Sequence, residues 1–347
     1  SVVEKTVGHI VREEINIAGS GSAFECWYGG KERQTLPTYH TMETCVTFTW
    51  MQLCNRLLQI TGNSLYADYM EKATYNALMA SLKNDASQIA KYSPLEGCRH
   101  EGEEQCGMHI NCCNANGPRA FAMIPQFAYQ VEKETVHINF YAPSELEWTL
   151  PNKKSVLLKQ MTDYPATDKI EIEVEPAKEA DFTVALRIPA WSKQTIVSVN
   201  GKAEKETLPG AYLPITRKWK KGDRITIQLD LRARLVEQDG AQAIVRGPIV
   251  LARDSRFNDG YIDETSVIVS KDGYVDLTPV KAPGFAWLAF TAPLVLGTDL
   301  EGNAAAKPVY FCDFASAGNT WDKAQRYRVW LPKTLNVQHA PYVPYNR

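Results

Sequence analysis

The sequence contains no apolar run near the roughly 20 residues that span a bilayer, so no membrane-spanning helix is expected. It also lacks an excess of one charge: 38 Lys and Arg stand against 40 Asp and Glu, for a formal net charge of -2. A polyanionic partner such as nucleic acid is therefore not expected. No signal-peptide pattern opens the chain, which says little about compartment.

Cysteine is scarce outside the first third of the chain. Of eight cysteines in 347 residues, only Cys312 lies beyond position 113. This number is too small for a disulfide scaffold, and the clustering suits a local site better than dispersed structural bridges. Hydrophobic residues make up 44% of the chain, enough to build the cores of about two or three domains.

Residues 1–133 are predicted to be mostly helical. Apolar side chains recur every three or four residues over 46–60 and 64–83, as on one face of a helix. Proline suits the first helical turn, so a third helix is expected to open at Pro118. The intervening loop, 84–113, is long and rich in Cys, Gly and Glu, which favours a functional role.

From residue 134 the apolar period changes to two. Alternation over 136–140, 170–174, 182–188 and 225–231 predicts short strands separated by turns such as Asn200-Gly201. This pattern predicts a β-sandwich over 134–255, and residues 256–347 form a further β-rich region. The expected fold class is α+β and multidomain.

Two short motifs carry candidate metal ligands. The first is Glu43-Thr44-Cys45 and the second is Cys112-Cys113. Adjacent cysteines rarely bridge each other, because the ring is strained, which leaves metal binding, nucleophilic chemistry or both. Zinc accepts thiolate and carboxylate ligands in tetrahedral geometry and keeps cysteine as the reactive thiolate. A closed, inert structural zinc site is the alternative interpretation.

Glu25 lies in a loop rich in glycine and aromatic residues over 19–30, which can face a sugar. Glycosidases place two groups on opposite sides of the scissile bond, usually two carboxylates. Here a thiolate can take the place of one of them. The plainer interpretation of Glu25 is an acid on a surface loop. Trp27 and Tyr92 offer rings on which a sugar can stack.

Four stretches together resemble a known family: 21–27 (GSAFECW), 43–45, 92–96 (YSPLE) and 112–119 (CCNANGPR). Their combination resembles the β-L-arabinofuranosidases of glycoside hydrolase family 127, and is most similar to the related family 146 of pectin-degrading bacteria. Segments 217–223 and 246–250 are similar to the β-sandwich of that family. The resemblance is good over about residues 15–255 and weak beyond.

The resemblance implies part of an (α/α)6 barrel followed by β-sandwich domains. The expected division is 1–133 for the C-terminal part of the barrel, 134–255 for the sandwich and 256–347 for a β-rich domain. It also implies a bound Zn²⁺ whose ligands are Glu43, Cys45, Cys112 and Cys113.

The resemblance further implies roles for single residues. Cys112 is expected to be the nucleophile of a retaining reaction through a thioglycosyl intermediate. The family's acid/base is a glutamate upstream of the Glu-x-Cys motif. Glu25 is the best match, although the family's residue falls about two positions later, at Trp27. Tyr92 falls where a family tyrosine touches the sugar.

The leading hypothesis is a zinc-dependent glycosidase that releases β-L-arabinofuranose, or a related sugar, from pectic glycans. The alternatives are the same fold acting on another pectic sugar, and a non-catalytic carbohydrate-binding or structural fragment with a closed zinc site. Family members carry roughly half of the barrel ahead of the matched region, so that half is an expected partner. Periplasmic or secreted placement is expected from the family.

Overall fold

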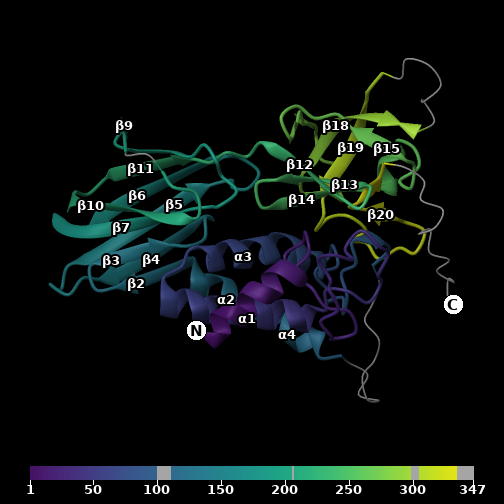
Figure 1. The fold of residues 1–347 in the computed structure, drawn as a ribbon. Coiled ribbons are helices and arrows are strands. Elements are labelled where there is room, and N and C mark those ends of the chain that lie inside the picture. Colours follow the sequence, from purple (N-terminus) through teal and green to yellow (C-terminus); the bar gives the residue numbers. More distant parts are fainter. Residues whose placement is uncertain (100–110, 205–206, 298–304, 334–347) are drawn as a thin grey trace. The chain divides into compact units, whose positions relative to one another are not determined.

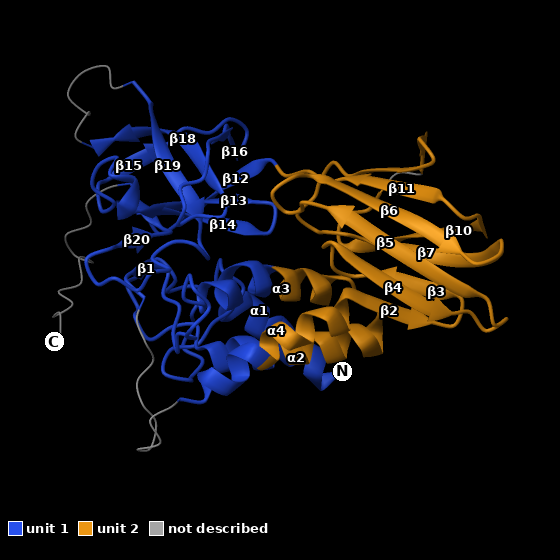
Figure 2. Ribbon diagram, turned by 180° about the vertical axis from the view of Figure 1, so that it is seen from behind, with its two compact units in different colours: residues 1–50, 72–118, 232–347 blue, residues 51–71, 119–231 orange. Residues whose placement is uncertain are grey.

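The computed structural model describes residues 1–99, 111–204, 207–297 and 305–333 (Figure 1). The chain divides into two compact units, each assembled from separate stretches of sequence (Figure 2). Unit 1 comprises 1–50, 72–118 and 232–347, and unit 2 comprises 51–71 and 119–231. The expected boundaries near 133 and 255 remain predictions.

The helices lie in the first part of the chain. They are α1 (Val2–Glu13), α2 (Thr44–Thr61), α3 (Leu65–Ala73), the π-helical segment η1 (Thr74–Leu78) and α4 (Cys113–Ala128); a short 3-10 turn, η2 (Ser255–Phe257), follows much later. Strands account for most of the remaining regular structure. The described residues therefore contain few helices and many strands, and the (α/α)6 barrel stays a prediction. None of the described helices is both long and apolar enough to cross a membrane.

Unit 2 contains two sheets. One has the strand order β10-β7-β3-β2, built from β2 (Tyr129–Glu132), β3 (Thr135–Ile138), β7 (Ala180–Ile188) and β10 (Ala211–Trp219). The other has the order β4-β5-β6-β11-β8-β9, built from β4 (Ser144–Thr149), β5 (Ser155–Thr162), β6 (Lys169–Pro176), β8 (Ile196–Val199), β9 (Lys202–Ala203) and β11 (Asp223–Gln228).

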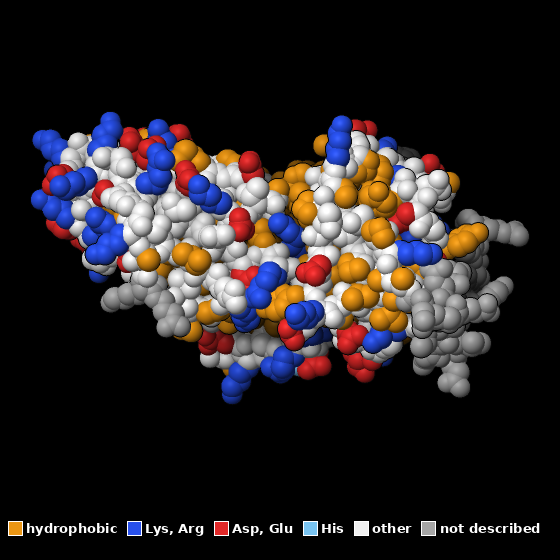
Figure 3. Space-filling view, turned by 90° about the horizontal axis from the view of Figure 1, so that it is seen from above, with side chains coloured by type: hydrophobic (Ala, Val, Ile, Leu, Met, Phe, Trp, Pro, Cys, Tyr) orange, Lys and Arg blue, Asp and Glu red, His pale blue; other side chains and the backbone are white. Residues whose placement is uncertain are grey.

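Aromatic side chains join the two sheets of unit 2. Phe182 of β7 meets Trp148 of β4 edge-on at 5.6 Å between ring centroids, and stacks on Trp219 of β10 at 5.8 Å. Alternate residues of β5 and β6 are buried, as the period-two pattern predicts. Figure 3 shows Lys and Arg side chains interspersed with Asp and Glu on the face that it draws. Ion pairs on the surface of unit 2 include Arg224–Glu173, at 3.3 Å.

The C-terminal part of unit 1 forms an 11-stranded sheet. Its main path is β15-β18-β19-β14-β13-β12-β16, and β1, β17, β20 and β21 pair at its sides. The bounds are β1 (Glu96–Gly97), β12 (Ala233–Gln238), β13 (Ala241–Arg246), β14 (Ile249–Asp254), β15 (Ser266–Ile268), β16 (Tyr274–Val275), β17 (Thr278–Pro279), β18 (Ala289–Leu296), β19 (Lys307–Asp313), β20 (Tyr327–Arg328) and β21 (Leu331–Pro332).

Two helices differ from the sequence-based expectation. The helix expected over 64–83 changes to a π-helix at Thr74, because the buried Asn76 side chain bonds both to Pro248 O and to Val250 N across the unit 1 core. The helix expected to open at Pro118 begins at Cys113 instead. Asn111 turns the chain just ahead of it, since its Oδ1 accepts a 2.9 Å bond from the Cys113 N–H.

Candidate metal and active site

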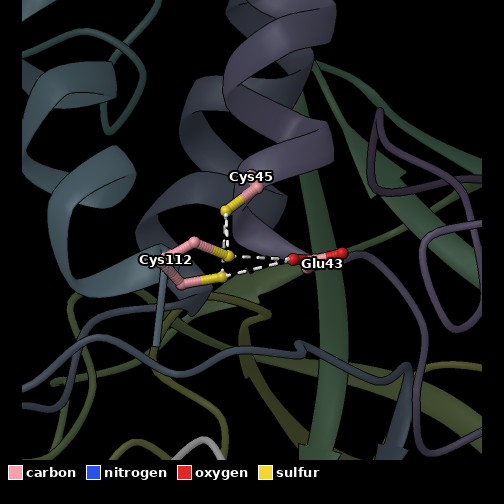
Figure 4. Close-up of side chains that lie close together, drawn as sticks. Glu43, Cys45 and Cys112 are labelled. Atoms are coloured by element: carbon pink, nitrogen blue, oxygen red, sulfur yellow. Dashed lines mark hydrogen bonds between the residues drawn. The ribbon is translucent and has the colours of Figure 1, made fainter. Parts of the chain in front are cut away.

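Two helix N-termini in unit 1 bring together the four ligand candidates. Glu43 directly precedes α2 and Cys45 lies in its first turn, while Cys112 and Cys113 stand at the start of α4. Figure 4 shows the side chains of Glu43, Cys45 and Cys112 pointing toward one another. Peptide dipoles give a helix N-terminus a partial positive charge, so both helix ends favour ionised thiols and carboxylates there.

The start of α2 is hydrogen-bonded to the segment at residues 90–91. The Thr44 hydroxyl donates to Ala90 O at 2.7 Å, and the Thr44 N–H donates to Lys91 O at 2.9 Å. The same Lys91 carbonyl lies 3.9 Å from Cys113 Sγ. These contacts hold Glu43, Cys45 and Cys113 at fixed places although they are distant in sequence.

The four ligand atoms all lie within 4.8 Å of one another. Cys45 Sγ is 3.0 Å from Cys112 Sγ and 3.4 Å from Cys113 Sγ, while Glu43 Oε1 is 3.6 Å and 3.7 Å from the same two sulfurs. A disulfide needs about 2.05 Å between sulfurs, so the cysteines are free thiols. Four atoms at 2.0–2.3 Å from a tetrahedral zinc lie about 3.3–3.8 Å apart, close to these spacings.

The charges of Glu43, Cys45, Cys112 and Cys113, together called the tetrad, also fit a cation. The four groups shift one another's pKa values. Contact with Cys113 lowers the pKa of Cys45 to about 5, and burial raises the pKa of Cys112 to about 12. Burial likewise raises the pKa of Glu43 to about 7. Its Oε2 is buried without a hydrogen-bond partner among the described residues. Such an orphaned carboxylate oxygen beside three sulfurs suits a thiophilic divalent metal such as zinc.

Glu25 and Lys91 form an ion pair beside the tetrad. Lys91 Nζ lies 3.8 Å from Glu25 Oε1, with the Lys91 side chain 9% exposed and the Glu25 side chain 53% exposed. The negative charge of Glu25 contributes to the raised pKa of Glu43, which places the two carboxylates within electrostatic reach. Glu25 has a positive φ of 67°, so the loop turns sharply at this residue.

The loop that carries Glu25 is folded around another carboxylate. Glu14 Oε2 accepts the backbone N–H groups of Tyr28, Gly29 and Gly30 at 3.0, 2.9 and 3.0 Å. Glu14 is 8% exposed, and these three bonds satisfy its buried charge. The loop therefore has a defined course although it contains little regular structure.

Tyr92 stands in an aromatic group with Lys91. The Lys91 ammonium lies 5.2 Å from the centroid of the Tyr92 ring, and His40 meets that ring edge-on at 5.1 Å. Phe24 stacks on His40 at 4.3 Å. Burial alone lowers the pKa of Lys91, but its contact with Tyr92 and the charges of Glu43 and Glu25 raise it overall. Lys91 therefore stays charged at neutral pH.

The 11-stranded sheet holds the segment that carries Tyr92. In β1, Glu96 pairs with Arg328 of β20, and the Val329 N–H donates to Leu95 O at 2.9 Å. The buried Tyr327 hydroxyl donates to Pro94 O at 2.6 Å. A C-terminal sheet thus positions a residue of the candidate site more than 200 positions earlier in the chain.

The structure brings together all four predicted ligands and places Glu25 and Tyr92 around Lys91. Sequence analysis missed three neighbours: His40, Lys91 and Asn116. Asn116 Nδ2 lies 3.2 Å from Cys45 Sγ. Asn116 follows Cys112 by four residues, a spacing that places two side chains on the same face of a helix, so the sequence could have indicated this neighbour. The interactions of His40 and Lys91 depend on tertiary contacts. Residues 100–110 of the expected functional loop lie outside the described residues.

Two family models match the chain. The catalytic domain of β-L-arabinofuranosidase, GH127, matches residues 2–126, and the middle domain of the same family matches residues 135–231. A curated relative, a non-reducing end β-L-arabinofuranosidase from Bifidobacterium longum subsp. longum, is 24% identical over 241 residues. That alignment covers 63% of this chain and 36% of the relative.

Solved structures with a similar fold carry the same family designation. A GH127 β-L-arabinofuranosidase from Geobacillus stearothermophilus T6 aligns with a TM-score of 0.77 at 20% identity, over 93% of this chain and 55% of that one. A GH127 β-arabinofuranosidase aligns with a TM-score of 0.79 at 25% identity, over 97% and 56%. The chain thus spans about half the length of these structures and a smaller share of the curated relative.

Proposed function

Because this chain belongs to glycoside hydrolase family 127, we propose that it takes part in the retaining hydrolysis of β-L-arabinofuranosides, or of a related sugar, in plant pectic glycans. The observation that carries the proposal is the convergence of the Glu43/Cys45/Cys112/Cys113 tetrad inside the segment matched by the family's catalytic domain. The tetrad would hold Zn²⁺. A bound zinc would keep the cysteines as thiolates at neutral pH.

Cys112 is proposed as the nucleophile. Its side chain is partly exposed, whereas Cys113 is fully buried and cannot meet a sugar. The Cys112 sulfur would bond to the anomeric carbon while the glycosidic C–O bond breaks. Glu25 would give its proton to the departing oxygen and then take one from water. That water attacks the anomeric carbon as the C–S bond breaks, so two inversions give net retention.

Two neighbours of Glu25 bear on its proposed role as acid and base. Lys91 holds a positive charge 3.8 Å from the Glu25 carboxylate and so restrains its position. The Tyr92 ring offers a surface for a sugar, whose C–H groups pack well on aromatic faces. Periplasmic or secreted placement and the participation of a further barrel half are parts of the same proposal.

Synthetic glycosides test the reaction directly. We expect release of the aryl group from an aryl β-L-arabinofuranoside, with smaller or no release from the matching α-L-arabinofuranoside, β-D-galactofuranoside and α-L-rhamnoside. Activity on another member of this panel would assign the same fold to another pectic sugar. No turnover of any glycoside, with the further barrel half supplied, would contradict the enzymatic proposal.

A closed zinc site is the second candidate, because four protein ligands already complete a tetrahedron, as in structural sites. Thiol labelling separates the two. An accessible catalytic thiolate should react with iodoacetamide at Cys112 in the folded protein, and faster once a chelator has removed the metal. Complete protection of Cys112 until the protein unfolds would favour the structural role.

The metal content gives the first prediction. We expect about one zinc per chain by elemental mass spectrometry, and loss of most of it in Cys45→Ser, because a serine hydroxyl is a far weaker zinc ligand than a thiolate. Cys26→Ser is the matched control, since Cys26 is exposed and lies outside the tetrad. Equal zinc in wild type and Cys45→Ser would remove Cys45 from the site.

The acid/base role of Glu25 gives the second prediction. Glu25→Gln should lower kcat/KM by about 10²–10⁴-fold on glycosides with alkyl leaving groups, which need protonation. Aryl glycosides with acidic leaving groups should be affected less in the first step. Glu32→Gln changes an exposed acid two residues beyond that loop; it is the control and should retain activity. Undiminished turnover of both substrate types by Glu25→Gln would exclude this assignment.

A further inference from the structure

The tetrad has a charge that one divalent ion does not balance. Three thiolates and one carboxylate carry four negative charges when all four bind metal, and zinc supplies only two positive ones. Sites of this kind depend on hydrogen bonds from neighbouring groups that orient the ligands and offset their charge. The two helix N-termini supply part of this compensation. A side-chain donor that reaches a ligand sulfur directly would supply more.

Asn116 is such a donor. It lies on α4, one turn beyond Cys112, and its backbone N–H bonds to Cys112 O at 3.0 Å. Its side-chain amide Nδ2 reaches Cys45 Sγ on α2 at 3.2 Å. Asn116 therefore joins the helix that carries one half of the tetrad to a ligand in the other half.

The backbone next to Asn116 is held in place. A Cβ atom on the following residue, Gly117, would come within 2.9 Å of the Ile89 side chain. Glycine at position 117 therefore lets α4 pack closer to Ile89 than any larger residue would. Ile89 directly precedes the segment 90–91 to which α2 is anchored through Thr44. The distance from Asn116 to Cys45 is thus set by packing on both sides.

We propose that Asn116 is a positioning residue of the metal site, which orients the Cys45 thiolate and offsets its charge. This inference rests on the metal-binding part of the proposed function. An N–H···S bond withdraws electron density from sulfur and makes it a weaker nucleophile. The bond to Asn116 therefore keeps Cys45 as a ligand, while Cys112 remains the sulfur offered to substrate.

Metal affinity tests the proposal without an activity assay. Zn²⁺ would be titrated into apo-protein against a chromophoric chelator for wild type, Asn116→Ala and Asn116→Asp. Asn114→Ala is the matched control, because Asn114 is an exposed asparagine two residues away on the same helix. We expect Asn116→Ala to weaken zinc binding by about 10–100-fold and Asn114→Ala to leave it unchanged. Asn116→Asp, of similar size but without the N–H donor, should also bind zinc more weakly than wild type.

The absorption spectrum of the Co²⁺-loaded protein distinguishes a positioning role of Asn116 from a role in packing alone. In the Co²⁺-loaded protein, loss of the N–H···S bond should move the sulfur-to-cobalt charge-transfer band to lower energy, an effect that a mere packing change does not produce. Wild-type affinity and an unmoved band in Asn116→Ala and Asn116→Asp would overturn the role of Asn116. Failure of the wild-type protein to bind either metal would instead overturn the proposed metal site.

Discussion

Replacing Cys112 by serine is expected to lower kcat for glycoside hydrolysis by at least about 10³-fold, because a hydroxyl is a far poorer nucleophile than a thiolate at neutral pH. Cys112, which is partly exposed, follows Asn111 directly and lies within 3.6 Å of Glu43 Oε1, is the proposed nucleophile, whereas the adjacent Cys113 is buried. The measurement is the turnover of an aryl β-L-arabinofuranoside by wild type and Cys112→Ser.

Zinc content must be measured in the same samples, because Cys112 is also a candidate ligand. Loss of turnover with zinc retained would assign a chemical role to the sulfur. A substrate-shaped electrophile should also label Cys112 in the wild type, and peptide mass spectrometry would locate the adduct. Cys26→Ser should keep full activity, since that cysteine is exposed and outside the tetrad. Comparable turnover by Cys112→Ser would rule out a cysteine nucleophile at this position.

Replacing Arg187 by methionine is expected to destabilise unit 2 by about 3–5 kcal/mol, because the change leaves two buried carboxylates without their counter-charge. Arg187 on β7 is 0% exposed, and its guanidinium lies 2.5 Å from both Asp68 Oδ1 and Glu71 Oε1 of α3. Its Nε also donates to Asn139 O at 2.6 Å. The free energy of unfolding, obtained from urea titrations, is the quantity to compare.

The control for Arg187 is an arginine in a surface ion pair. Arg224 on β11 is half exposed and lies 3.3 Å from Glu173, so Arg224→Met should cost about 1 kcal/mol or less. Replacing Asp68 and Glu71 together with Arg187 by apolar residues should restore much of the lost stability, because no charge then remains buried. A cost for Arg187→Met no larger than for Arg224→Met would contradict this account.

The cost of Arg187→Met should also depend on pH. Burial already raises the pKa of Asp68 to about 6 in the folded protein, and removal of the arginine charge raises it further. A carboxyl whose folded pKa lies above its unfolded value disfavours folding at neutral pH, and this penalty shrinks as pH falls below the folded pKa and is gone below the unfolded pKa. Relative to wild type, the variant should therefore be least destabilised below about pH 6.

Part of the fold was predictable because local patterns there agree with tertiary packing. The period-two alternation in β5 and β6 matches their alternating burial, since each strand has one face on the core. The helices were less predictable at their ends. Pro118 suggested a helix start, but α4 begins five residues earlier, just after the turn that Asn111 makes with Cys113. The helix expected over 64–83 changes to a π-helix after α3, where Asn76 bonds to Pro248 and Val250.

The sequence by itself determined the set of candidate ligands, because a carboxylate and three thiols in the Glu-x-Cys and Cys-Cys motifs suit few purposes besides metal binding and nucleophilic chemistry. Only the tertiary structure decided what surrounds those ligands. Lys91 beside Glu25, and the Asn116 amide on Cys45, follow from how α2, α4 and segment 90–91 pack. Such contacts join residues far apart in the chain, and local propensity carries no information about them.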